Sequence, residues 1–192
     1  MIEIIHHTDN RLHQGDIIRD VTFIENVTNV ANKLKISKVI FPLVIVLSQE
    51  CDLLQNFNER CINKGEDKHL FSVLVAPLYN FEHFIDGLHL SDLDKKMQQF
   101  SRNKTKSDNR NLRYNNNPRY HYMEFKEPRI VPSVIDFKHY FGVELTSLES
   151  HRASNIVCSV ASIYREAISQ RFCSYLSRIG LPNANVKDNL ND

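Results

Sequence analysis

The chain has 192 residues, of which 42% are hydrophobic and 24% charged, a composition typical of a soluble globular protein. Its four cysteines form no CxxC pair, and neither GxGxxG nor GxxxxGK[ST] occurs, which argues against a disulfide framework and a glycine-rich nucleotide loop. The net charge of +1 conceals an asymmetry, because residues 95–121 hold eight basic residues and one acid. No apolar run reaches the roughly 20 residues of a membrane helix, and the N-terminus lacks a secretory pattern, so we expect a cytoplasmic protein with no membrane contact.

Three strands are predicted in the first half of the chain. Residues 16–25 alternate between apolar and polar side chains, as a half-buried strand does. Residues 39–47 and 70–78 are apolar on both faces, so we expect them to lie side by side in the middle of a bent sheet. The polar stretch 26–37 is predicted to be a hairpin loop or a single helical turn. Residues 52–69 form a long connection, of a kind that is often functional.

The second half of the chain predicts two helices and three short strands. Ser91 is expected to cap a helix that runs to about residue 100, followed by an asparagine-rich loop over 101–118. Apolar residues at helical spacing predict a C-terminal helix over about 159–179, ended by Gly180 and Pro182. The predicted strands are 120–125, 130–137 and 138–145.

These elements predict a mainly β fold with α-helices (α+β), built as a small barrel or strongly bent sheet with a long C-terminal helix. Residues 1–182 are expected to form a single domain. The barrel core would span about 15–158 and the helix about 159–179. Residues 183–192 are expected to be a flexible tail.

The stretch 42–52, PLVIVLSQECD, is the first candidate site, because an apolar strand stops abruptly at polar and reactive side chains. Cys51 would be a nucleophile if a histidine such as His13 lowered its pKa, with Gln49 and Asp52 completing the site. The alternative is that Cys51 packs as a small hydrophobic residue while Asp52 caps the next turn. We favour the alternative, and so expect a buried Cys51 that reacts slowly.

A polar cluster at 13–20, HQGDIIRD, opens the first strand. It would either complete a pocket with Gln49 and Asp52 or form a tight turn capped by Asp16. The nine histidines of the chain form neither HxxxH nor HExxH, so no metal site is predicted, and no cofactor motif is present.

The order of three segments resembles that of the PemK/MazF toxins: GDII at 15–18, PLVIVLSQ at 42–49 and VLVAPLY at 73–79. This resemblance implies an SH3-like barrel and an RNA substrate. Two positions depart from the family, because Phe41 stands where it has a catalytic arginine and Tyr79 aligns with its catalytic threonine. Phenylalanine cannot hold a phosphate as arginine does, which puts nuclease activity in doubt. The segments SQECDL and REAISQRFCSYLSRIGLP also resemble those of bacterial proteins with an SQxCDL segment.

The basic segment 95–121 is the second candidate site, because cations neutralise phosphates and aromatic rings stack on unpaired bases. As loop cations, its arginines are expected to contribute little to stability. The alternative is a solvated basic loop. The candidate nucleic-acid-binding residues are Arg110, Arg113, Arg119, Tyr120 and His121.

The leading hypothesis is a protein that binds RNA or another polyanion, within a toxin–antitoxin or phage-defence system. A second hypothesis is a non-enzymatic interaction or sensor module that recruits a partner protein encoded nearby. A third is a thiol-dependent enzyme built on Cys51. The sequence does not predict an oligomeric state.

Overall fold

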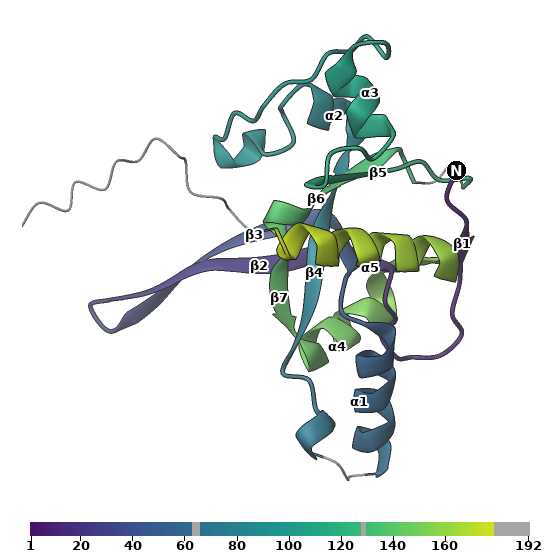
Figure 1. The fold of residues 1–192 in the computed structure, drawn as a ribbon. Coiled ribbons are helices and arrows are strands. Elements are labelled where there is room, and N and C mark those ends of the chain that lie inside the picture. Colours follow the sequence, from purple (N-terminus) through teal and green to yellow (C-terminus); the bar gives the residue numbers. More distant parts are fainter. Residues whose placement is uncertain (63–65, 128–129, 179–192) are drawn as a thin grey trace, which may run out of the picture.

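The computed structural model describes residues 1–62, 66–127 and 130–178 (Figure 1). These residues form one curled antiparallel sheet with helices on it, so the predicted α+β fold with a strongly bent sheet is confirmed. The strands are Ile4–Ile5 (β1), Asp16–Val30 (β2), Lys33–Val46 (β3), Ser72–Asn80 (β4), Tyr120–Met123 (β5), Ser133–Asp136 (β6), Phe141–Glu144 (β7) and Ile156–Val160 (β8). The α-helices are Glu50–Ile62 (α1), Phe81–Ile85 (α2), Ser107–Arg113 (α3), Leu145–Asn155 (α4) and Ser162–Leu176 (α5), with 3-10 turns at Glu66–Lys68, Ser91–Leu93 and Phe137–His139.

The strands follow the order β1-β8-β2-β3-β4-β6-β5, and β7 pairs with the other part of β4. The prediction that 39–47 and 70–78 are adjacent is confirmed, since Val44 of β3 pairs with Pro77 of β4. Both strands are apolar on two faces because the sheet is covered on both sides. Ile45 packs with the α5 layer, whereas its neighbour Val44 packs on the opposite face, against α1 and α4.

Helix α5 lies across one face of the sheet (Figure 1). Ile168 and Phe172 point into the core beneath it, as their helical spacing predicts. The Phe172 ring lies 5.5 Å from the ring of Phe137 and 5.2 Å from that of Tyr140. This helix is therefore integral to the fold. The predicted stop at Gly180–Pro182 and the tail at 183–192 lie outside the described residues.

Strands β2 and β3 extend beyond the sheet as a long two-stranded arm, residues 24–40, which projects from the body (Figure 1). The prediction of a loop or helical turn at 26–37 was therefore wrong. The chain reverses at Ala31 and Asn32, whose φ angles of 51° and 59° suit a two-residue hairpin turn. β-Branched residues on either side of this turn favour strands, although they have no core to cover.

Several helices differ from their prediction. Residues 52–69, expected to be a connection, contain most of α1, and 138–145 holds the short strand β7 before α4 begins. The helix predicted from Ser91 is only one 3-10 turn, ended by Asp94 in the left-handed conformation. The loop predicted at 101–118 contains α3, whose buried Leu112 anchors it on the β5–β6 hairpin side of the sheet. Tertiary packing of single apolar residues stabilises these short helices, and such packing leaves little periodicity to detect.

Candidate functional site

The polar residues after β3 lie on α1 rather than on a strand-end loop. Cys51 and Asp52 are both exposed, and the Cys51 thiol lies 3.6 Å from the Gln49 amide oxygen and 3.5 Å from the Asp52 carboxylate. The prediction that Cys51 is buried was wrong. The first turn of α1 directs Leu53 into the core, which turns Cys51 to solvent. No histidine contacts the thiol among the described residues, so the structure does not assemble the predicted nucleophile–base pair.

His13 is instead held by Glu50, a residue that the sequence analysis did not select. Its Nδ1 lies 3.2 Å from the Glu50 carboxylate and its Nε2 lies 2.7 Å from that of Asp9. Glu50 also accepts hydrogen bonds from Arg11, at 2.6 Å, and from the Gln14 backbone N–H, at 2.8 Å. The cluster fixes the N-terminal segment on the start of α1.

The charges of this cluster reinforce one another. Burial opposes ionisation of Glu50, but hydrogen bonds from His13 and Arg11 outweigh it and lower the pKa of Glu50 to about 2. Burial also opposes protonation of His13, yet its bonds to Glu50 and Asp9 raise the pKa of its imidazole. Both ring nitrogens of His13 are therefore engaged, and the ring has no free lone pair for a general base.

Asp16, predicted to cap a turn, is fully buried and binds Arg152. The Arg152 guanidinium donates to its carboxylate at 2.6 Å, the His13 backbone N–H donates at 3.0 Å, and the Ser159 hydroxyl donates as well. These partners join β2 to α4 and β8. Gln49 and Asp52 line none of the three cavities described below, and the polar cluster around Asp16 stabilises the fold.

The basic segment is divided between structural and free cations. Arg119 donates two hydrogen bonds, of 2.8 and 2.6 Å, to the buried carboxylate of Asp136. The Arg113 guanidinium lies 4.3 Å from the centre of the Phe81 ring. Tyr120 and His121 are buried, and burial lowers the pKa of His121 to about 3. The exposed cations that form no ion pair with any described residue are Lys95, Lys96, Lys104, Lys106 and Arg110.

A cavity of about 350 Å³, here called the aromatic cavity, lies beside the base of the arm. Five phenylalanine and tyrosine side chains line it, and the partly exposed rings of Phe23, Phe41 and Tyr140 are among them. Lys95 and Glu25 supply the charged groups of its lining. The remaining lining residues are Val39, Tyr79, Leu90, Leu93, Met97, His139 and Phe141.

A second cavity of about 440 Å³, here called the His89 cavity, adjoins the first. The two cavities share a wall that includes Phe41, Tyr79 and Leu90. The positions that the PemK/MazF resemblance aligns with the family's catalytic arginine and threonine therefore lie together between the cavities. Tyr79 comes from β4 and Phe41 from β3, two strands whose pairing the apolar pattern predicted.

Tyr79 is the first of a series of polar side chains in contact with one another, which the sequence did not predict. Its hydroxyl lies 2.9 Å from Nδ1 of His139, whose Nε2 lies 3.7 Å from the Asp136 carboxylate. Burial, and then the nearby Asp136 charge, raise the pKa of Tyr79, while burial lowers that of His139. The series of side-chain contacts ends at Arg119, whose positive charge neutralises Asp136. No local sequence motif reveals this series, because the other three side chains lie 40 to 60 residues from Tyr79 in the sequence.

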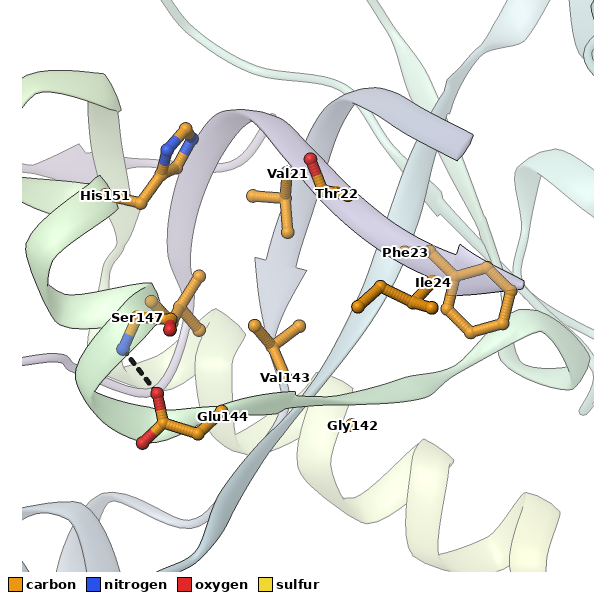
Figure 2. A pocket seen from close by; sticks show the side chains of 10 residues that line it. Val21, Thr22, Phe23, Ile24, Gly142, Val143, Glu144, Ser147 and His151 are labelled. Atoms are coloured by element: carbon orange, nitrogen blue, oxygen red, sulfur yellow. Dashed lines mark hydrogen bonds between the residues drawn. The ribbon is translucent and has the colours of Figure 1, made fainter. Parts of the chain in front are cut away.

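A third cavity, of about 380 Å³, lies between β2, β7 and α4 (Figure 2). Its two ionisable side chains, Glu144 and His151, already have partners. Glu144 accepts hydrogen bonds from the N–H groups of Thr146 and Ser147 at the start of α4, and His151 contacts the carbonyl of Arg19 at 2.8 Å. The other lining residues shown in Figure 2 are largely apolar, so this cavity offers less chemistry than the two beside Tyr79.

In the described part of the chain, no group of three or more histidine, cysteine or acidic side chains is placed to hold a metal ion. None of the helices described is long and apolar enough to cross a membrane. Comparison with protein-family models, with curated proteins and with solved structures found no match. The candidate site therefore depends on the geometry around Tyr79.

Proposed function

We propose that this protein binds single-stranded RNA in the cytoplasm, with an unpaired base in the aromatic cavity and adjacent phosphates on Lys95 and Lys96. The observation that carries this proposal is the combination of accessible aromatic rings with Lys95 in one cavity. Proteins hold unpaired nucleotides by stacking bases on aromatic rings while cations neutralise the backbone.

Two free lysines at the cavity favour a polyanion over a neutral ligand, and the acid in the lining, Glu25, accepts a hydrogen bond from Ser37 at 3.0 Å. Lys95 and Lys96 are exposed and form no ion pair among the described residues, so binding a phosphate would not disrupt a folded contact. Arg119 and Arg113, by contrast, are committed to Asp136 and to Phe81. We therefore assign phosphate contacts to the two lysines, and leave Arg110 as the one predicted arginine that is free to contribute.

Phe41 and Tyr79 favour an activity in which the protein binds RNA without cleaving it. Phe41 and Tyr79 occupy the positions of the family's arginine and threonine, and neither side chain can stabilise a pentavalent phosphate as arginine does. The ring of Phe41 can instead stack on a base. A role within a toxin–antitoxin or phage-defence system would then depend on RNA recognition.

The test is the affinity for a fluorescently labelled single-stranded RNA, measured by anisotropy at several salt concentrations. Affinity should fall as salt rises, and Lys95→Ala with Lys96→Ala should reduce the salt slope by roughly one to two. Phe41→Ala should weaken binding by about 1–3 kcal/mol, the value of one stacked base.

The matched control is Lys33→Ala with Lys35→Ala, which removes the same charge from the arm. Unfolding curves of every variant identify any loss that reflects folding. Salt-insensitive binding, or equal losses from the two lysine pairs, would refute the assignment of phosphates to the aromatic cavity.

The arm supports a second candidate function, recruitment of a partner protein. Side chains alternate across a hairpin, so Leu34, Ile36 and Ile40 share one face, joined by the cross-strand neighbour Val27. All are more than half exposed. Residues 26–38 also carry three lysines and no acid, so the partner would present an apolar surface rimmed by acidic groups.

Co-expression with the products of neighbouring genes tests this second candidate. A partner that copurifies with the wild-type chain should be lost from Leu34→Ser with Ile36→Ser. It should be retained by Lys35→Ser, on the opposite face of the arm. Equal retention by all variants would exclude the apolar face as the contact.

A further inference from the structure

The His89 cavity contains hydrogen-bonding groups that a base stacked in the aromatic cavity would not contact. The His89 ring stacks on Phe84, with 4.4 Å between centres, and lies 4.6 Å from the Tyr79 ring. Both of its ring nitrogens are shielded from solvent and have no hydrogen-bond partner among the described residues. A shielded donor and acceptor without partners cost free energy, which a ligand that hydrogen-bonds to them would recover.

Burial lowers the pKa of His89 to about 4, so the ring is neutral near pH 7. A neutral imidazole presents one N–H donor and one acceptor, which suits the edge of a nucleobase. Aliphatic side chains line the cavity beside the ring, among them Leu43 of β3, Leu78 of β4 and Leu90 of the loop after α2. The cavity thus combines apolar surfaces with a polar group, as sites for flat heterocycles do.

The two cavities differ in the charged residues that line them. Asp92 lines the His89 cavity, and none of the lining residues in the described part of the chain is a lysine or an arginine. The aromatic cavity is lined by a lysine, Lys95, as well as by an acid, Glu25. A phosphate is therefore disfavoured in the His89 cavity, and a base that donates hydrogen bonds is favoured. Among the four RNA bases, only guanine presents two adjacent donors on its Watson–Crick edge, which a carboxylate accepts as a pair.

We infer that the His89 cavity selects guanine, with the Asp92 carboxylate accepting from the guanine N1–H and amino groups. The His89 ring, whose nitrogens are shielded in this structure, would turn toward the cavity and donate to O6. The inference rests on the proposed RNA binding and specifies its substrate: an unpaired guanine next to a second, stacked nucleotide. The shared wall of Phe41 and Tyr79 would separate the two bases.

The test compares GMP with AMP, CMP and UMP by calorimetric titration, and the labelled RNA U₅ with U₂GU₂ by anisotropy. GMP and U₂GU₂ should bind roughly tenfold or more tightly than their counterparts. Asp92→Asn, at an exposed position, should abolish the preference. The matched control is Asp94→Asn, which removes the same charge two residues away, outside the cavity lining, where asparagine tolerates the φ of 54°.

His89→Phe keeps a ring for stacking on Phe84 but removes both nitrogens, and should also lose the preference for guanine. If this variant does not fold, Asp92→Asn decides alone. Salt-dependent RNA binding with equal affinity for U₅ and U₂GU₂ would overturn the inference and leave the proposed function intact. A GMP preference that needs Asp92, without RNA binding, would support the cavity assignment and refute the RNA function. Absence of both would refute both.

Discussion

Arg119→Ala should destabilise the fold, although Arg119 belongs to a segment whose cations were expected to contribute little to stability. The Asp136 side chain is only 1% exposed, and both of its oxygens accept from the Arg119 guanidinium. Removing one partner of a buried ion pair costs about 3–5 kcal/mol. Because 28% of the Arg119 side chain is exposed, water can reach the vacated site, and we expect about 2–3 kcal/mol.

Arg110→Ala is the matched control, because Arg110 is exposed on α3 and forms no ion pair with a described residue. Its cost should be about 0.5 kcal/mol or less. The assay is urea denaturation of both variants, with Asp136→Asn and the double variant completing a thermodynamic cycle. If Arg119→Ala and Arg110→Ala each changed the unfolding free energy by less than 0.5 kcal/mol, the division into structural and free cations would be refuted.

Three further predictions concern the core, the charged cluster and the thiols. Phe172→Ala should cost about 3–5 kcal/mol in urea denaturation, against about 0.5 kcal/mol for exposed Arg178→Ala; equal small losses would mean that α5 is not packed. The extra stability that the wild type has over Glu50→Gln should be largest between about pH 4.5 and 6.5. It should shrink as pH falls toward 2, because Glu50 then protonates, and as pH rises through the raised pKa of His13; a pH-independent difference would contradict the pairing. Exposed Cys51 and Cys173 should react with iodoacetamide in the folded protein, whereas Cys158 should not, because burial raises the pKa of its thiol to about 12. Mass spectrometry would identify the modified cysteines, and an unmodified Cys51 would contradict its exposed position on α1.

The sequence predicted those elements whose apolar pattern is long. The strands at 39–47 and 70–78 and the helix face of Ile168 and Phe172 were recovered, because each covers an extended part of the core. The arm was missed because most of residues 26–37 are polar, which is typical of a loop; its two strands pair with each other and their side chains are exposed.

The candidate site was less accessible to sequence reasoning. Glu50 was passed over in favour of its neighbour Cys51, because which of two adjacent residues faces inward depends on where α1 begins. His89, His139 and Asp136 meet Tyr79 only through the pairing of distant strands. The PemK/MazF resemblance singled out Phe41 and Tyr79 by alignment alone, and it stays a prediction, because the comparisons matched no family, curated protein or solved structure.

The central claim is that RNA occupies the two cavities beside Tyr79, and photochemical cross-linking tests it most directly. An RNA of the form U₂GU₂ with 4-thiouridine on either side of guanine would be irradiated with the protein, and the modified peptides mapped by mass spectrometry. Cross-links should fall on Phe41, Tyr140 and the segment 88–97, and Phe41→Ala should reduce them. Cross-links confined to the arm or to α3, or unchanged by Phe41→Ala, would contradict the account.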